Sequence, residues 1–174
     1  LLASPLVPNF WRAYTDNDRG NKHHERCAPW REAGKLRRLV SLSCEEHAGL
    51  VKVTAEYRLP SAGQSSCTIG YEVHADGRVE LDMLLSPSEG LPEIPEIGVM
   101  LEMAGSFDTV SWYGKGPHDS YADRQKGARL GAFEGKVRDQ FVPYLRPQEC
   151  GNKTEVRHAF VGDESGRGLV IQGL

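Results

Sequence analysis

The sequence predicts a mainly β protein in which two antiparallel sheets pack as a sandwich, with one short helix. From Val51 to Leu59, apolar and polar residues alternate with a period of two, which is typical of a strand with one buried and one solvated face. Asp76-Gly77 stands between two further alternating runs, and both residues accept positive φ, which favours a hairpin turn. Strands in series, separated by Pro- and Gly-rich turns, favour two packed sheets.

In chain order, the helix comes first and the strands follow. Pro29 suits the first helical turn because its φ is already fixed, and the helix is expected to continue through Ala33 until Gly34 interrupts it. The Pro-rich stretch 86–95 is interpreted as a long turn inside one domain. The predicted strands cover residues 51–59, 67–73, 79–85, 97–103, 110–113, 154–161 and 169–174.

Length and charge limit the classes of function. The 174 residues match the size of one domain and are too few for a catalytic barrel with accessory modules. We expect residues 1–174 to form a single, truncated domain, because the sequence begins without Met and opens on an apolar segment. With 21 basic and 24 acidic residues, the net charge of -3 favours neither nucleic acid nor an anionic membrane as a partner. No run approaches the roughly 20 apolar residues that span a bilayer, so a soluble protein is expected.

The cysteines lack the spacing of a metal knuckle or a disulfide framework. Free thiols in a reducing cytoplasm are predicted, although an export signal could precede this sequence and two disulfide bridges stay open as an alternative. The four residues are Cys27, Cys44, Cys67 and Cys150.

Two segments invite a metal interpretation. Residues 16–20 alternate oxygen ligands as a calcium loop does, but Asn21 stands where that loop needs Gly and Cys27 where it needs Glu, so a turn bonded to its own backbone is favoured. His23 and His24 with Cys27 could bind zinc, but adjacent histidines rarely face one ion and no second cluster completes the set. The sequence therefore predicts no metal in this chain.

The segment 114–117 resembles a phosphate-binding loop only superficially, because the Gly-Lys-Ser/Thr spacing is absent and Pro117 lacks an amide donor. A tight turn after a strand is the better interpretation. A glycosidase needs two carboxylates, and Asp119, Asp123 and Glu149 are the most distinctive ones here. A structural role is favoured for them, for example with Asp123 paired to Arg124.

Aromatic side chains could form stacking surfaces for a sugar, but each is also an ordinary core residue of a β-sandwich. For most of them a core position is favoured, and Trp112 in particular is expected in the core. The six are Trp11, Trp30, Trp112, Tyr113, Tyr121 and Tyr144.

Three phrases carry a resemblance to a known family: FWRAYTDNDRG at 10–20, WYGKGPHDSYADR at 112–124 and PYLRPQECGN at 143–152. They resemble the C-terminal β-sandwich (small-chain) domain of glycoside hydrolase family 2 β-galactosidases. Tyr14 and Ala122 stand where Pro is usual, and Cys150 stands where Asn is usual.

The resemblance implies a galactose-mutarotase-like supersandwich packed on a catalytic TIM barrel that holds the family's two catalytic glutamates, so no catalytic residue is expected in this chain. It also implies that a mobile loop lies at the rim of the active site, with Gly20 as its hinge and the helix containing Trp30 at its far end. The candidate loop residues are Asp16, Asn17, Asp18, Gly20 and Asn21. The motif residues expected to be structural are Trp11, Arg12, Gly114, Gly116, Pro117, Tyr121, Asp123, Arg124, Pro147, Gln148 and Glu149.

The implied function is a non-catalytic part of an enzyme that hydrolyses terminal β-D-galactosides such as lactose. Its partners would be the barrel and other domains of the same polypeptide, the galactoside substrate and, as in other family members, further copies of the enzyme. The parent enzyme is expected to use magnesium and a monovalent cation bound outside this chain. Two alternatives stay open: a free-standing carbohydrate-binding module, and an aldose mutarotase with His74, His118 or His158 as its base.

Overall fold

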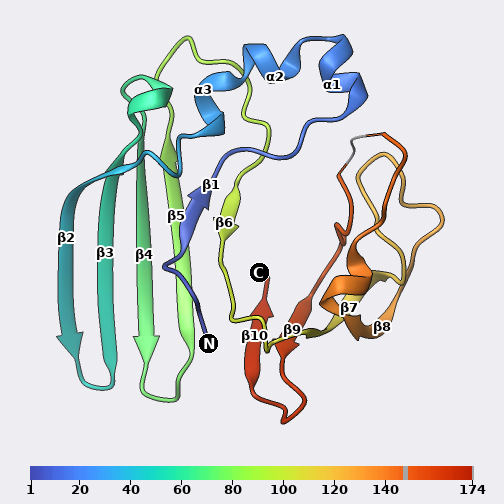
Figure 1. Ribbon diagram of the computed structural model, residues 1–174. Coiled ribbons are helices and arrows are strands. Elements are labelled where there is room, and N and C mark those ends of the chain that lie inside the picture. Colours follow the sequence, from blue (N-terminus) through green and yellow to red (C-terminus); the bar gives the residue numbers. More distant parts are fainter. Residues whose placement is uncertain (147–148, 174) are drawn as a thin grey trace. The chain divides into compact units, whose positions relative to one another are not determined.

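The computed structural model describes residues 1–146 and 149–173, and the chain divides into two compact units (Figure 1). The first unit comprises Leu1–Leu6, Ala13–Asn21 and Leu101–Leu174. The second comprises Val7–Arg12 and Lys22–Met100. Both units therefore combine segments that are far apart in the sequence. The single domain expected for residues 1–174 stays a prediction.

The second unit is built on a four-stranded antiparallel sheet with the order β2-β3-β4-β5 (Figure 1). A two-stranded pair, β1 with β6, and short helices complete this unit. Its strands are β1 (Val7–Asn9), β2 (Arg38–His47), β3 (Leu50–Arg58), β4 (Ser66–His74), β5 (Val79–Ser86) and β6 (Gly98–Met100). Its helices are α2 (His23–Arg26), α3 (Ala28–Arg31) and the 3-10 turn η1 (Pro60–Ala62).

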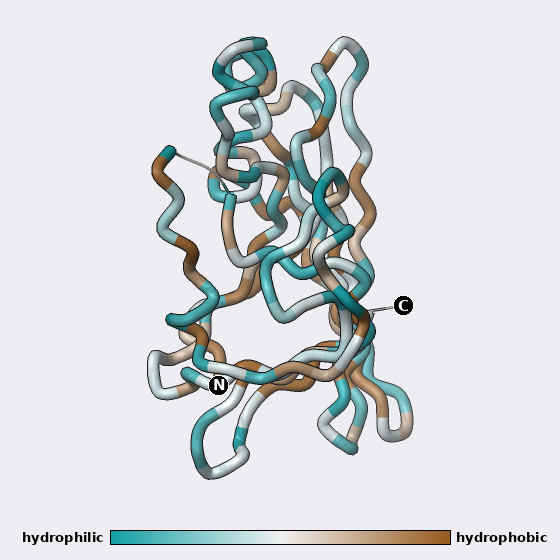
Figure 2. The backbone as a smooth tube through the Cα atoms, turned by 90° about the vertical axis from the view of Figure 1, so that its right-hand side faces the viewer, coloured by the Kyte–Doolittle hydropathy of each residue, from teal (hydrophilic) through white to brown (hydrophobic). Residues whose placement is uncertain are grey.

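The strand register gives this sheet one apolar face, because cross-strand partners point to the same side. Leu42, Ala55, Ile69 and Met83 lie in one row across the four strands. The opposite side carries mainly charged and hydroxyl side chains, which alternate with the apolar ones along each strand. Figure 2 colours the backbone by hydropathy, and hydrophilic and hydrophobic stretches alternate along the chain. The residues that form the apolar face are Leu39, Leu42, Cys44, Val51, Val53, Ala55, Tyr57, Cys67, Ile69, Tyr71, Val73, Val79, Leu81, Met83 and Leu85.

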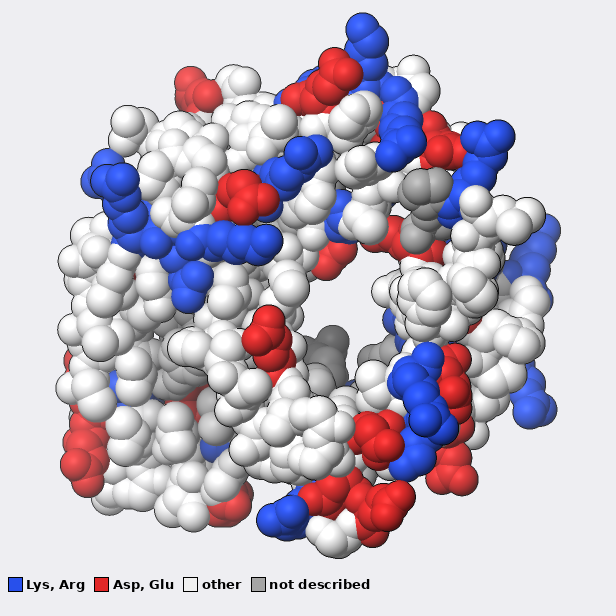
Figure 3. Space-filling view, in the orientation of Figure 1, with Lys and Arg blue, Asp and Glu red and all other residues white. Residues whose placement is uncertain are grey.

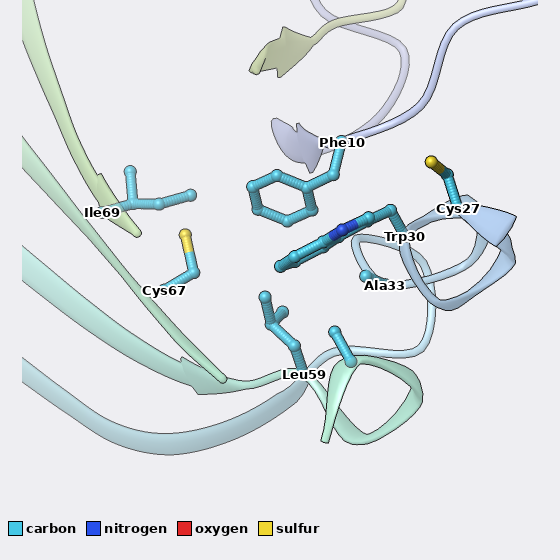
Figure 4. Packing of buried hydrophobic residues seen from close by; sticks show 8 residues of the cluster. Phe10, Cys27, Trp30, Ala33, Leu59, Cys67 and Ile69 are labelled. Atoms are coloured by element: carbon cyan, nitrogen blue, oxygen red, sulfur yellow. The ribbon is translucent and has the colours of Figure 1, made fainter. Parts of the chain in front are cut away.

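A hydrophobic cluster covers part of the apolar face. Phe10 and Trp30, whose ring centroids are 5.8 Å apart, pack toward Leu59, Cys67 and Ile69, and all five are at most 1% exposed (Figure 4). The Trp30 indole N–H donates to the backbone oxygen of Pro92 at 3.1 Å, which satisfies its one polar group. Helix α3 therefore anchors the chain to the sheet through Trp30.

The first unit contains a second four-stranded antiparallel sheet, with the order β10-β9-β7-β8. Trp112 of the central strand β7 is buried and stands opposite Phe133 of β8, with ring centroids 5.4 Å apart. The elements of this unit are helix α1 (Asp16–Gly20), β7 (Thr109–Gly116), β8 (Arg129–Lys136), the 3-10 turn η2 (Val137–Gln140), β9 (His158–Gly162) and β10 (Gly168–Gln172).

The mainly antiparallel β prediction is confirmed, since each unit contains a four-stranded antiparallel sheet. The Asp76-Gly77 hairpin is also confirmed, since it joins β4 to β5. Each predicted strand has a counterpart, although β6 and β9 are shorter than expected. The prediction of a single helix is wrong, because short helices also form at residues 16–20 and 23–26.

No helix within the described residues is long and apolar enough to cross a membrane.

Strands β1, β2 and β8 were not predicted, and β2 shows why. A register shift between Leu39 and Ser41 inserts Val40 as an extra residue. The bulge breaks the period-two pattern, so Leu39, Val40 and Leu42 do not alternate with polar residues. In β8, Gly131 and Gly135 weaken the strand signal for a different reason, since Gly has low β propensity.

Candidate functional site

Residues 16–20 form helix α1, so the expected loop is helical at its start. Thr15 is the N-cap: its hydroxyl accepts from the Asp18 amide at 3.3 Å, while the Asp18 carboxylate accepts from the Thr15 amide at 2.8 Å. This reciprocal pair is a capping box, which satisfies amide groups that a helix start leaves without intrahelical partners. Acidic side chains in the first turn also suit the helix dipole.

Two arginines support α1 from outside the capping box. Arg146 donates from Nη1 to the Asp16 carboxylate at 3.2 Å, which ties α1 to the third sequence phrase. Arg19 lies with its guanidinium carbon 5.0 Å from the centroid of the Tyr14 ring, and its Nη2 donates to the Tyr14 hydroxyl at 3.4 Å. Tyr14, which departs from the family pattern, therefore packs against the helix that follows it.

The five candidate loop residues divide into two kinds. Asp18 is 6% exposed, and its carboxylate serves the helix start. Asn17, Gly20 and Asn21 are exposed, and Asp16 is half-buried beside Arg146. The groups that could reach a ligand are thus Asp16, Asn17 and Asn21, with Asp18 holding their backbone in place.

The second and third phrases meet in a cluster around Asp119. The Tyr144 hydroxyl donates to the Asp119 carboxylate, with distances of 2.8 and 3.1 Å to its two oxygens, and accepts from Arg124 Nη1 at 3.0 Å. Arg124 Nη2 is 3.5 Å from Asp119, and its guanidinium carbon is 4.4 Å from the centroid of the Tyr121 ring. Burial raises the pKa of Tyr121.

The cluster corrects the pairing expected from sequence. Asp119, whose side chain is 8% exposed, is the carboxylate that faces Arg124, whereas Asp123 is exposed. Neighbours in sequence need not point toward each other in a turn, and Tyr121 to Arg124 is a tight turn closed by a backbone hydrogen bond of 3.0 Å. Because both Asp119 oxygens are engaged by the Tyr144 hydroxyl, its arrangement suits positioning rather than proton transfer.

A further set of hydrogen bonds joins the second and third phrases. Ser120 donates its amide to the Asn152 backbone oxygen at 2.8 Å, and Asn152 Nδ2 donates to the Ser120 backbone oxygen at 2.7 Å. The hydroxyls of Ser120 and Thr154 lie 2.8 Å apart. With the Asp16–Arg146 contact, segments of all three phrases become one network within the first unit.

Gly114 and Gly116 lie inside strand β7, so the expected turn after the strand is wrong. A Cβ on Gly116 would lie 2.7 Å from the Phe133 ring, and one on Gly114 would lie 2.9 Å from the Val156 backbone. These glycines therefore permit close packing over the buried Trp112 and leave no phosphate loop. Pro117 follows directly through a cis peptide bond.

The remaining motif residues have separate locations. Trp11 is half-buried in the second unit with the Arg31 guanidinium carbon 4.7 Å from its ring centroid, and Arg12 lies beside it in the chain. Glu149 is half-buried. Pro147 and Gln148 lie outside the described residues.

Among the described residues, the three tryptophans that could form a sugar-binding platform are buried or half-buried. Trp30 and Trp112 are 1% and 5% exposed, and Trp11 is half-covered by Arg31. This burial counts against the alternative of a carbohydrate-binding module. Tyr113 stacks on His158, with centroids 5.7 Å apart, but it is only 37% exposed.

Arg146 is one of the residues of this site that the sequence did not indicate. It stands in the third phrase between Leu145 and Pro147, but nothing in its local spacing indicates a partner 130 positions away. The sequence feature that could have indicated Arg146 is its position in a phrase that resembles the family.

These features define a class: a mainly antiparallel β domain in which three separated motifs are joined by charged and polar hydrogen bonds beside a capped surface helix. The chain belongs to the beta galactosidase small chain family, whose model matches residues 1–172.

Similar proteins named beta-galactosidase agree with this assignment. The one from Priestia megaterium is 47% identical over 174 residues, covering 100% of this chain and 17% of that protein. The one from Halalkalibacterium halodurans is 34% identical, covering 98% of this chain and 17% of that protein. The one from Lactobacillus delbrueckii subsp. bulgaricus is 39% identical, covering 90% of this chain and 16% of that protein. The chain thus spans about a sixth of the length of these relatives.

Proposed function

We propose that this chain is a non-catalytic portion of a β-galactosidase that hydrolyses terminal β-D-galactosides such as lactose. In this proposal the catalytic glutamates belong to a barrel domain of the same polypeptide, and the chain packs on that barrel and presents α1 at the rim of the active site. The relatives' names and the small part of their length that the chain matches support the parent activity.

The observation that carries the packing role is the uncovered part of the apolar face. Leu39, Leu42 and Val79 are 55%, 62% and 53% exposed, and Leu81 and Val73 are 39% and 38% exposed. Figure 3 shows mainly uncharged side chains over the middle of the β2–β5 region on the side that faces the viewer, with Lys and Arg gathered above them and Asp and Glu at the lower edge. We call these five residues the open apolar patch. Patches of this kind mark surfaces that other protein segments cover.

The structure of α1 supports its proposed place at a sugar site. Asp16, Asn17 and Asn21 bring carboxylate and amide groups to a helix whose start is fixed by the capping box. Such groups hydrogen-bond the hydroxyls of a sugar. A substrate held in one orientation reacts faster, so a contact made outside the catalytic domain can still change turnover.

The test uses purified full-length parent enzyme and the isolated chain, with a nitrophenyl β-galactoside as substrate. The isolated chain should release no nitrophenol, while Asp16→Asn and Asn17→Ala in the full-length enzyme should each change kcat or KM severalfold at unchanged thermal stability. Asp123→Asn is the matched control, since Asp123 is exposed and lies in the same set of motifs. Turnover by the isolated chain would overturn the non-catalytic role. Unchanged kinetics in both α1 variants would overturn the rim role.

Three further expectations belong to the same proposal. Magnesium and a monovalent cation would bind elsewhere in the parent enzyme, and the enzyme would assemble as a homo-oligomer. A cytoplasmic location fits the four free thiols, of which Cys44 is exposed. Equilibrium sedimentation of the parent enzyme tests the assembly.

A further inference from the structure

Three potential metal ligands from two distant segments converge in the second unit. His23 begins α2, Cys27 follows its last residue as the C-cap, and Glu93 lies in the segment between β5 and β6. One ligand atom from each lies within 4.8 Å of the other two. His23 and Cys27 are four residues apart, a spacing that places two side chains on one helix face.

The sequence alone offered His24 instead of Glu93 as the companion of His23 and Cys27. In the structure, His24 Nε2 lies 3.8 Å from the carboxylate of Glu25, while Glu93 completes the set from 66 positions beyond Cys27. Rules based on the spacing of ligands in the sequence do not predict a contact between residues so far apart in the chain. The expectation that this chain binds no metal rested on the adjacency of His23 and His24 and on the lack of a second ligand cluster in the sequence.

We propose that His23, Cys27 and Glu93 form a binding site for a divalent transition metal of the zinc class. Imidazole, thiolate and carboxylate are all accepted by zinc, and three protein ligands leave a fourth position for water. The thiolate disfavours magnesium and calcium, which take oxygen ligands. This inference is independent of the proposed galactosidase role.

The geometry requires only small side-chain adjustments. Metal–ligand bonds of about 2.0–2.3 Å in a tetrahedron separate the ligand atoms by roughly 3.3–3.8 Å. The upper limit of 4.8 Å in the structure therefore exceeds the liganded spacing by about 1.0–1.5 Å at most. Rotation of the Glu93 and His23 side chains can supply this distance, because neither is fully buried, whereas Cys27 is.

Arg26 forms hydrogen bonds with the Glu93 carboxylate at the proposed site. Its Nε donates to the two Glu93 oxygens at 3.2 and 3.4 Å, and Nη2 also donates to Oε1. A carboxylate has about four lone-pair sites, so Glu93 can accept from Arg26 along one edge and bind a metal along another.

A metal here would fasten α2 to the segment before β6. Trp30 already contacts this segment through the backbone oxygen of Pro92. In Figure 4, Cys27 lies on the helix side of the hydrophobic cluster, with Trp30 and Phe10 between it and the sheet residues Cys67 and Ile69. The thiol therefore borders the cluster on the side away from the sheet.

The test is titration of the isolated chain with Co²⁺, which reports thiolate ligation through a charge-transfer absorption band, followed by displacement with Zn²⁺. We expect one Co²⁺ per chain and a band that disappears in Cys27→Ser. His23→Gln and Glu93→Gln should each weaken binding by at least about tenfold. The matched controls are Cys44→Ser and His24→Gln, which should bind as the unmodified chain does.

Two results would overturn the proposal. One is a chain that shows no thiolate band with Co²⁺. The other is binding that falls equally in the controls and in His23→Gln and Glu93→Gln. Because Cys27→Ser changes a buried residue, its circular dichroism is compared with that of the unmodified chain. His23→Gln and Glu93→Gln change residues that are not fully buried, so the test does not depend on Cys27→Ser folding.

Discussion

Gly34 is the residue at which the smallest change should have the largest effect. A Cβ at this position would clash with the backbone oxygen of Pro8 in β1, and backbone atoms cannot rotate away as a flexible side chain can. We expect Gly34→Ala to lower the free energy of unfolding by about 3 kcal/mol, as overpacking of a tight contact does. Urea denaturation followed by tryptophan fluorescence measures this.

Gly20→Ala is the control for Gly34→Ala. A Cβ on Gly20 would meet no atom within 4 Å, and Gly20 is a helical residue of α1. Alanine favours helix over glycine by up to about 1 kcal/mol, so this variant should be unchanged or more stable. Equal losses in both variants would contradict the role assigned to the Gly34 contact.

At the residue scale, the sequence indicates which residues are important. It indicates less well which residues contact one another. Asp119, Arg124 and Tyr144 stand in the phrases that resemble the family. The pairing of Arg124 with Asp119, however, can be seen only in the folded structure. Glu93 and Arg146 each meet partners more than 60 positions away. Charge pairs of this kind depend on the conformation of the loops that bring the two residues together. The hydrophobic periodicity of the sequence does not predict that conformation.

At the element scale, the periodic strands were predictable and the irregular ones were not. Strand β3 alternates without interruption, because its register with β4 is regular and the extra residue of the β2–β3 pair lies on β2. The bulge in β2 and the glycines of β8 remove that signal, as the structure shows. Helix α1 was missed for a related reason: five residues are too few to show a helical period, so only its capping box could have indicated it.

The capping box gives a prediction for α1. Thr15→Ala removes the hydroxyl that accepts from the Asp18 amide, and loss of an N-cap side chain costs about 1 kcal/mol. We expect faster amide hydrogen exchange at Arg19 and Asn21, whose amides bond to Thr15 and Asn17. Thr15→Ser keeps the hydroxyl and should retain the slow exchange. Fast exchange in Thr15→Ser as well would show that the hydroxyl is not what holds the helix.

At the scale of the whole molecule, acid should destabilise the chain through exposed ion pairs. The hydrogen bond from Arg26 lowers the pKa of Glu93 from 4.5 to about 2, and hydrogen bonds from Ser165 and then Arg167 lower that of Asp163 from 3.8 to about 2. A carboxyl group with a depressed pKa in the folded state stabilises the fold above its ordinary pKa. That stabilisation is lost as the pH falls from about 4.5 toward 2.

We therefore expect Glu93→Gln to be less stable than the unmodified chain at pH 6, with a difference that shrinks as the pH approaches 2. Arg26→Gln should behave in the same way, since it removes the other partner. Urea denaturation at a series of pH values, in buffer with a chelator, measures both. A difference that stays constant from pH 6 to pH 2 would contradict the link between this pair and acid sensitivity.

The open apolar patch and its opposite face provide a matched comparison for the packing role. Leu42 and Leu84 are both 62% exposed, but Leu42 lies on the apolar face and Leu84 on the polar one. In the isolated chain, Leu42→Ser and Leu84→Ser should each change the free energy of unfolding by no more than about 0.5 kcal/mol. In the full-length enzyme, Leu42→Ser should cost about 1.5–3 kcal/mol, because burying a leucine side chain contributes that much. Leu84→Ser should still cost little, and equal effects of the two in the full-length enzyme would show that the apolar face does not receive the rest of the enzyme.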